Sequence, residues 1–283
     1  MPCLQRHRSD DVTLLGDDTV AAGGVTFAFT ERTGGTSAAP YASLNLGDRC
    51  GDDPACVERN RALALAAVGA SGLAGRLVVP HQVHGDHVVV VREGEGALDR
   101  ALDEAHAGAD AVVCVAREVP VMLCFADCVP VVLVAPDGFA VVHSGWRGTA
   151  ARICEKAARV LCREVGCAPD DLLAYVGPHV QACDYEVSQE LVDRFVDGFG
   201  PGANSSGRLL DLGHCVRAAL LAAGVPEASV ACCDVSTASA TDRFFSYRAE
   251  HGRCGRHAAV AVMGAGRPHW EPLAPEGGAG HVR

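Results

Sequence analysis

The chain has 283 residues, of which 49% are hydrophobic and 21% are charged, and its formal net charge is −11. This length suffices for a large core, and we expect one domain rather than two small ones. The acidic balance argues against unaided binding to nucleic acid or to an anionic membrane, because both partners need a basic face. The expected partner is a small molecule.

Cysteine usage and the N-terminal segment predict the cellular compartment. The 14 cysteines are scattered through apolar runs such as residues 112–115, unlike the framework of a short secreted domain. Residues 1–10 contain no apolar signal segment, and every apolar run ends before the roughly 20 residues that a membrane helix needs. We therefore expect a cytoplasmic protein with free thiols.

Hydrophobic periodicity predicts the elements of the first half of the chain. A strand at 25–29 is followed by a loop rich in Gly, Ser and Thr. Asp53 and Pro54 have the form of an N-cap and a first-turn proline, so a helix is predicted from there to about residue 70. Strands are predicted at 77–79, 87–91, 111–115, 121–125, 131–135 and 139–143. The turn residues 136–138 (Pro-Asp-Gly) predict an antiparallel hairpin for the last two.

In the second half of the chain, segments with the hydrophobic periodicity of helices alternate with segments typical of strands. Helices are predicted at 150–165, 187–196 and 211–223, and strands at 172–176, 230–233, 244–247 and 258–263. No repeat, low-complexity block or long linker divides the chain, so residues 1–263 are predicted to form one domain. Residues 264–283 are rich in Gly and Pro and are predicted to form a loose tail.

Three residues stand out as candidate metal ligands. His84, Cys128 and His143 offer two imidazoles and a thiolate, which a metal of the zinc type prefers. Cys128 and His143 fall near the open ends of the predicted hairpin, where neighbouring cross-strand positions are about 5 Å apart. Taken alone, each of the three is better explained as a core or surface residue. Their positions at strand ends beside Gly-rich loops instead favour a functional site. Three ligands leave a fourth position open for water, as in catalytic zinc sites.

Several polar residues near these ligands permit two interpretations. Backbone N–H groups after His143, together with Arg147, are suited to bind phosphate or carboxylate, or else Arg147 is only a surface cation. Asp127 is either a base, a carboxylate that orients a metal ligand, or part of a turn. Arg61 either faces a pocket or lies on a solvated helix face. His81 and His87 are expected to be solvated or structural, and the aromatic residues at 244–247 either pack in the core or stack on a base.

An ordered set of motifs over nearly the whole chain resembles the YfiH-type family, also called the laccase-domain or multicopper polyphenol oxidase-like family. The matching segments are 29–35, 41–47, 51–53, 60–61, 82–85, 109–111, 126–128, 143–148, 177–178, 185–187 and 245–248. The Cys128-to-His143 interval is two residues shorter than the family pattern, which preserves the facing of the strands. The loop at 177–184 also departs from that pattern.

The resemblance implies an α+β fold, a single layered domain of mixed β-sheets packed with α-helices. It places the metal on His84, Cys128 and His143 and implies a zinc-dependent purine nucleoside phosphorylase. The implied substrates are adenosine, inosine and methylthioadenosine, with adenosine deaminase activity alongside. The partners are then a nucleoside and phosphate. Alternatives under the same resemblance are a zinc amidase that edits peptidoglycan precursors and a copper-dependent polyphenol oxidase.

Within that interpretation, further residues are assigned to substrate and catalysis. Asn45, Arg61 and Arg147 are candidates to hold the phosphate or the sugar, and Asp127 is a candidate catalytic residue. Water in the fourth metal position is suited to attack C6 of adenine in the deamination.

The composition of the chain argues against laccase activity, although the family name includes that term. A four-copper laccase normally uses several His-x-His pairs, and the chain contains none. A single His₂Cys site resembles blue copper only with an axial Met, and of three methionines only Met122 is nearby in sequence. Zinc is therefore the predicted cofactor, with copper as the alternative.

Overall fold

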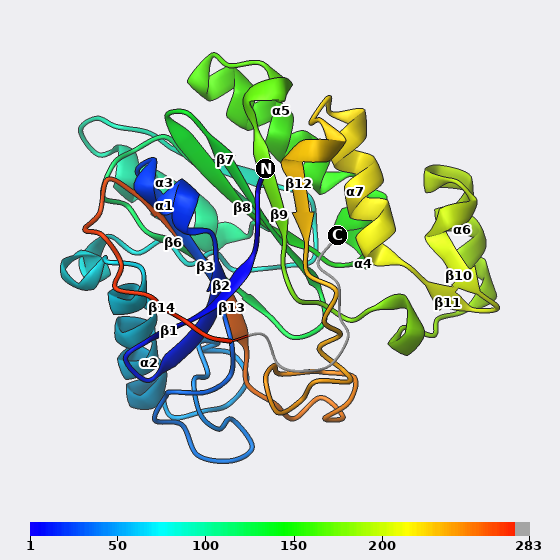
Figure 1. The fold of residues 1–283 in the computed structure, drawn as a ribbon, viewed down its shortest axis with the longest axis horizontal. Coiled ribbons are helices and arrows are strands. Elements are labelled where there is room, and N and C mark those ends of the chain that lie inside the picture. Colours follow the sequence, from blue (N-terminus) through cyan, green and yellow to red (C-terminus); the bar gives the residue numbers. More distant parts are fainter. Residues whose placement is uncertain (275–283) are drawn as a thin grey trace.

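The computed structural model describes residues 1–274, in which two six-stranded sheets lie against each other (Figure 1). Every pairing in the first sheet is antiparallel. Its strands in spatial order are β14 (Glu271–Pro272), β1 (Gln5–Ser9), β2 (Val12–Gly16), β3 (Val25–Thr30), β13 (His257–Met263) and β6 (Val121–Phe125).

The second sheet is mixed, with parallel pairs at both edges and antiparallel pairs between them. Its strands in spatial order are β12 (Val230–Cys232), β9 (Leu173–Val176), β7 (Val129–Ala135), β8 (Gly138–Ser144), β5 (Ala111–Cys114) and β4 (Val88–Val91). Every residue of β5, β7 and β8 is buried, as expected for strands covered on both faces. A small separate sheet pairs β10 (Asn204–Ser206) with β11 (Leu209–Leu210).

The main core lies between the two large sheets. It contains aromatic side chains from both, all at most 1% exposed: Phe27, Phe29, Phe125, Phe139 and Tyr175. Burying each such side chain contributes roughly 1.5–3 kcal/mol. Helix α2 (Pro54–Ala67) covers the outer face of the first sheet, and α5 (Ile153–Val165) and α7 (Leu212–Ala222) cover that of the second (Figure 1). The expected layered α+β fold is confirmed.

The remaining helices are α1 (Asp18–Ala22), α3 (Ala97–Ala107), α4 (Trp146–Ala150) and α6 (Gln189–Phe199). Helix α2 begins as predicted, because the Asp53 side chain accepts a hydrogen bond from the Ala55 backbone nitrogen and Pro54 occupies the first turn. The helix predicted at 150–165 corresponds to α5, which begins only at Ile153 because Arg152 adopts a φ of 58° and separates it from the short helix α4. Within residues 1–274, no helix has the length and apolar character that crossing a membrane requires.

Two predicted strands are wrong. Residues 77–79 form only an isolated bridge through Val78, and residues 244–247 form an irregular segment that enters a turn at Tyr247. In the second case two backbone donors of the segment are used locally, because the Ser246 nitrogen donates to the Glu250 carboxylate and the Phe244 nitrogen to the Ala240 carbonyl. The N-terminal strands β1 and β2 and the helix α3 have no counterpart among the predicted elements.

The segment after Met263 differs in part from the predicted loose tail. Strand β14 pairs with β1, and the Trp270 indole donates a hydrogen bond of 2.7 Å to the carbonyl of Ala67 at the end of α2. The Trp270 ring also stacks on His7, with ring centroids 5.0 Å apart. Residues 264–274 therefore pack on the domain, and the rest of the predicted tail, 275–283, lies outside the described residues.

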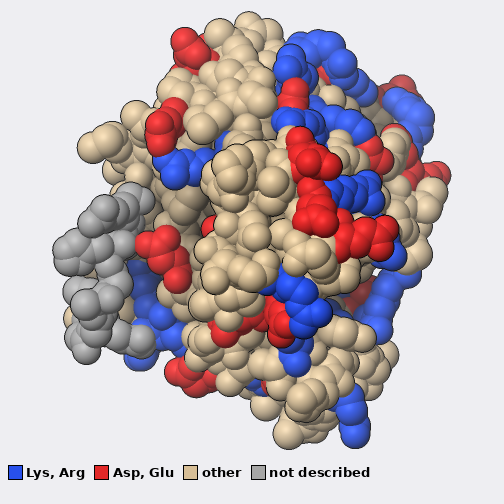
Figure 2. All heavy atoms as spheres, turned by 90° about the vertical axis from the view of Figure 1, so that its right-hand side faces the viewer, with Lys and Arg blue, Asp and Glu red and all other residues tan. Residues whose placement is uncertain are grey.

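The face seen at the right of Figure 1 carries both signs of charge. Figure 2 shows Lys and Arg side chains interspersed with Asp and Glu on this face. Ion pairs of this region include Arg208 with Glu186 and Arg217 with Glu227. Exposed pairs of this kind contribute roughly 0–1 kcal/mol each, so they affect solubility more than folding.

Candidate metal centre and active site

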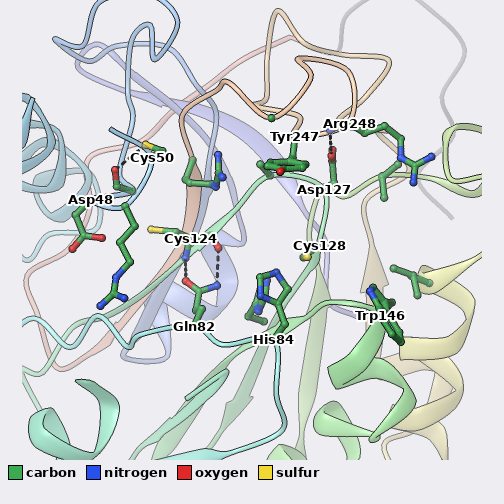
Figure 3. A pocket seen from close by; sticks show the side chains of 18 of the residues that line it. Asp48, Cys50, Gln82, His84, Cys124, Asp127, Cys128, Trp146, Tyr247 and Arg248 are labelled. Atoms are coloured by element: carbon green, nitrogen blue, oxygen red, sulfur yellow. Dashed lines mark hydrogen bonds between the residues drawn. The ribbon is translucent and has the colours of Figure 1, made fainter. Parts of the chain in front are cut away.

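Three potential metal ligands converge where the β7–β8 hairpin meets the loop before β4. His84 comes from that loop, Cys128 directly precedes β7, and His143 lies in β8. One ring nitrogen or sulfur atom of each lies within 4.8 Å of the others. Figure 3 shows His84 and Cys128 facing the same cavity. The structure thus brings together the three residues that the sequence predicts as ligands.

The hairpin register explains how Cys128 and His143 approach each other. Val129 pairs with Ser144 and Pro130 with His143, so Gly145 lies opposite Cys128 and His143 is its diagonal neighbour. A Cβ atom on Gly145 would lie 3.1 Å from the Cys128 sulfur and 3.1 Å from Cδ2 of His84. Because glycine has no side chain, Gly145 leaves room for Cys128 and His84.

Asp110 is a functional residue to which the sequence analysis assigned no role. Its side chain is fully buried and its Oδ1 lies 2.8 Å from Nδ1 of His143. The same carboxylate accepts hydrogen bonds from the backbone nitrogens of Val83, His84 and Gly85. This bonding keeps a proton on Nδ1 of His143, so Nε2 is the nitrogen that would bind a metal, which displaces any proton there. The available signal was a charged residue directly before the buried strand β5.

The electrostatics of the cluster favour a thiolate in the metal-free protein. Burial acts to raise the pKa of the Cys128 thiol, but the charge of His143 and hydrogen bonds from both imidazoles lower it to about 6. Burial acts to lower the pKa of His143, but the Cys128 thiolate and Asp110 raise it to about 9. Burial acts to raise the pKa of Asp110, yet the hydrogen bond from His143 and the backbone donors lower it.

The donor set is suited to a zinc ion. Zinc bonds of about 2.0–2.3 Å in a tetrahedron place the ligand atoms about 3.3–3.6 Å apart, so atoms within 4.8 Å need only small side-chain shifts. The ligands include one thiolate and one histidine oriented by a buried carboxylate, which is a common second contact of zinc-bound histidines. His84 is exposed toward the cavity, which leaves a side of the cluster open.

A cavity of about 860 Å³ adjoins the cluster, which is large enough for a nucleoside and an anion. Its wall combines the cluster with aromatic rings and cations. These wall residues include Trp146, Tyr185, Tyr247, Arg49, Arg248 and Arg256.

Asp127 lies at the cavity, but both of its carboxylate oxygens are engaged. Oδ1 accepts a hydrogen bond of 2.7 Å from the Thr237 hydroxyl, and Oδ2 accepts one of 2.7 Å from the backbone nitrogen of Arg248. Its φ of 88° lies in the left-handed region. Asp127 thus connects the Cys128 segment to the loops of Thr237 and Arg248. The carboxylate that orients a ligand of the metal cluster is that of Asp110.

The three predicted substrate-binding residues do not line the cavity within the described part of the chain. Asn45 is fully buried, and its amide bonds Gly47, Asp52 and the Arg256 nitrogen. Arg61 donates to the Leu46 carbonyl and pairs with Asp48 at 3.3 Å. Asn45 and Arg61 thus support the loop that carries Arg49 to the cavity.

Arg147 is exposed, and its guanidinium carbon lies 4.5 Å from the centre of the Trp146 ring. Arg147 is the second residue of helix α4, which has only five residues. The other histidines of the loop lie outside the cluster, as predicted: His87 pairs with Glu104 at 2.8 Å, and His81 does not line the cavity.

The fold and the site together define a single-domain α+β protein with one candidate mononuclear metal centre, within residues 1–274, on the wall of a large cavity. Residues 26–264 match the family described as multi-copper polyphenol oxidoreductase laccase. The chain belongs to this family, and the resemblance predicted from its motifs is confirmed.

Two relatives similar in sequence are named after a different activity from the family. The chain is 36% identical over 245 residues to the purine nucleoside phosphorylase YlmD of Geobacillus stearothermophilus, covering 82% of this chain and 88% of that protein. It is also 36% identical over 242 residues to the purine nucleoside phosphorylase of Deinococcus radiodurans, covering 83% and 88%.

Solved structures share the fold over almost their whole length. The crystal structure of the hypothetical protein YfiH of Bacillus licheniformis has a TM-score of 0.80 and 28% identity, covering 91% of this chain and 98% of that one. The crystal structure of YlmD of Geobacillus stearothermophilus has a TM-score of 0.76 and 32% identity, covering 90% and 96%.

Proposed function

We propose that this protein is a zinc-dependent purine nucleoside phosphorylase acting on adenosine, inosine and methylthioadenosine, with adenosine deaminase activity at the same site. The observation that carries the proposal is the His84, Cys128 and His143 cluster on a cavity of about 860 Å³ lined by aromatic rings and arginines. The names of the relatives in Geobacillus and Deinococcus support the same reaction. We place the protein in the cytoplasm, since its thiols are free.

Zinc is the proposed metal, held by the two imidazoles and the thiolate. When bound, it would supply Lewis acidity beside the cavity. Copper fits the donor set less well as a redox centre, because Met122 packs in the core beneath α2 and does not line the cavity. The described residues also hold one such cluster, whereas a laccase needs several copper ions.

Phosphorolysis joins a phosphate oxygen to C1′ of the ribose while the bond from C1′ to N9 of the base breaks. The products are ribose 1-phosphate and the free purine, which takes up a proton. The phosphate needs cations beside the sugar, and we propose Arg49, Arg248 and Arg256, because these arginines line the cavity. Asn45 and Arg61 act indirectly in this scheme, by holding the loop of Arg49.

Asp127 serves the reaction as a positioning residue in this proposal. Its carboxylate holds the backbone of Arg248 at 2.7 Å, and Arg248 in turn lies with its guanidinium carbon 4.8 Å from the Tyr185 ring centre. The catalytic role predicted for Asp127 remains a hypothesis. A base role predicts loss of kcat in Asp127→Asn, whereas positioning predicts a raised KM for phosphate.

The test is product analysis of adenosine incubated with the zinc-loaded protein, with and without phosphate. We expect adenine and ribose 1-phosphate only when phosphate is present, some inosine in both cases, and loss of all products in Cys128→Ala. Cys3→Ala, at an exposed cysteine away from the cavity, is the matched control and should retain activity. Zinc-loaded protein that forms no product from any purine nucleoside contradicts the proposal, and amidase activity on peptidoglycan precursors is then the next assay.

A further inference from the structure

Tyr247 is an exposed aromatic residue in a segment that is otherwise buried. Phe244, Phe245 and Ser246 are each 0% exposed, whereas the Tyr247 side chain is 57% exposed and lines the cavity. Figure 3 shows it on the cavity wall, above Cys128 and His84 in that view. Core packing does not explain a ring in this position.

The backbone on both sides of Tyr247 is held in place. The Ser246 nitrogen donates to the Glu250 carboxylate at 2.9 Å, and the Arg248 nitrogen donates to Asp127 at 2.7 Å. The Tyr247 carbonyl accepts a hydrogen bond of 2.8 Å from the Gly252 nitrogen. The ring is therefore presented on a fixed backbone, which lowers the entropy lost when a ligand stacks on it.

One surface of the ring is supported by its own loop. A Cβ atom at Gly252 would lie 3.2 Å from Cζ and Oη of Tyr247, and Gly252 has a φ of +80°. The Arg256 guanidinium carbon lies 5.8 Å from the ring centre. The Tyr247 hydroxyl makes no hydrogen bond to any residue in the described range 1–274.

Each of the three Trp and Tyr rings of the cavity has an arginine beside it, and the arginine of Tyr247 is the most distant of the three. The guanidinium of Arg147 lies 4.5 Å from the Trp146 ring centre, and that of Arg248 lies 4.8 Å from the Tyr185 ring centre. Both rings are also less exposed than Tyr247. Of these three rings, Tyr247 has the largest surface available to a ligand.

We propose that Tyr247 is the stacking platform for the base of the substrate, an inference that rests on the proposed nucleoside phosphorylase function. Stacking engages the π-face that every purine has and is insensitive to the group at C6. Among the purine nucleosides of the proposed function, those with a 6-amino and those with a 6-oxo group should therefore bind with similar affinity. Tyr247 is thus a binding residue for the base, whereas the arginines are proposed for phosphate.

The experiment compares Tyr247→Ala and Tyr247→Phe in the zinc-loaded protein, using adenosine and inosine. Base–aromatic stacking of about 1–3 kcal/mol corresponds to roughly 5- to 150-fold in affinity. We expect Tyr247→Ala to raise KM by a factor in this range, equal within about threefold for the two nucleosides. Tyr247→Phe should stay within about threefold of wild type for both nucleosides, because it keeps the ring.

Two controls separate this proposal from other effects. Leu221→Ala removes a partly exposed side chain on α7 that does not line the cavity, and it should leave every constant unchanged. Zinc content and thermal unfolding of Tyr247→Ala should match those of the wild type, because the side chain is largely exposed. An unchanged nucleoside KM in Tyr247→Ala overturns the proposal, as does a loss confined to one of the two nucleosides.

Equilibrium titration of adenosine into the zinc-loaded protein distinguishes failure of this inference from failure of the proposed function. If the wild type binds adenosine without turnover, the phosphorylase assignment fails and the Tyr247 variants still test stacking through the dissociation constant. If the wild type neither binds nor converts adenosine and inosine, both proposals are wrong.

Discussion

Asp110 links two of the three candidate metal ligands through one carboxylate oxygen. Its Oδ1 lies 2.8 Å from Nδ1 of His143 and 3.0 Å from the backbone nitrogen of His84. The side chain is fully buried, and the loop at 83–85 wraps around it with three backbone donors. A single carboxylate thus fixes the ring orientation of one ligand and the backbone of another.

Replacing Asp110 by Asn should weaken zinc binding by about 10- to 100-fold, because the amide has one acceptor oxygen for four donors and no charge. The measurement is competition for zinc against a chromophoric chelator. The matched control is Asp86→Asn. Asp86 lies on the same loop as His84, is partly exposed and pairs with Lys156 of α5. Zinc affinity within about twofold of wild type in Asp110→Asn would show that His143 is oriented in some other way.

Gly145→Ala tests whether the space beside the cluster is needed. Gly145 has φ −74° and ψ 171°, which Ala adopts without strain, so the main effect is the Cβ atom 3.1 Å from the Cys128 sulfur and the His84 ring. We expect about tenfold weaker zinc binding with an almost unchanged midpoint of thermal unfolding. Gly198→Ala, where an added Cβ meets nothing within 4 Å, is the control and should bind zinc normally. Equal zinc affinity in the two variants contradicts this account.

Alkylation of the metal-free protein should reveal the lowered pKa of Cys128. The thiolate form is lost as the pH falls through about 6, so the iodoacetamide rate at Cys128 should be half-maximal near that pH and level above about 7. Burial raises the pKa of Cys114 and Cys154 to about 12, so these thiols should remain unlabelled. The rates are measured by mass spectrometry of peptides, with the exposed Cys3 as the reference. Added zinc should protect Cys128, and a half-maximal pH above 8 or labelling unaffected by zinc argues against the site.

Most of the metal cluster could be predicted from the sequence, because two of its three ligands lie at the ends of one hairpin. The turn residues at 136–138 predict the hairpin, and the hairpin brings Cys128 close to His143. Asp110 and His143 are 33 residues apart, and no local pattern identifies their contact. The same limit applies to the cations, since loop packing decides that Arg49 rather than Arg61 reaches the cavity.

Local hydrogen bonding explains the main error in secondary structure. The apolar run at 244–247 has the composition of a strand, but the Ser246 nitrogen donates to the Glu250 side chain, and the chain enters a turn at Tyr247. Phe244 and Phe245 still pack in the core, while Tyr247 is left exposed to the cavity. Composition alone does not distinguish these outcomes, because they depend on side-chain bonds within a few residues.

His257 should make the protein sensitive to acid. Its ring is 1% exposed, packs near Phe125 and Phe244, and neither ring nitrogen has a hydrogen-bond partner among the described residues. Burial, together with the nearby charges of Arg256 and Arg32, lowers its pKa to about 3. The unfolded chain binds a proton below about pH 6.5 while the folded protein does not, so stability is lost as the pH falls from about 6.5 toward 3.

Each pH unit in that window should cost up to about 1.4 kcal/mol in the free energy of unfolding. His257→Leu removes the titrating group and keeps an apolar side chain, so its urea-unfolding free energy should fall less than that of the wild type between pH 7 and pH 5. His106→Leu, at an exposed position of α3, is the control and should keep the wild-type dependence. Parallel pH profiles for all three proteins would mean that the buried ring at position 257 is not the source of acid sensitivity.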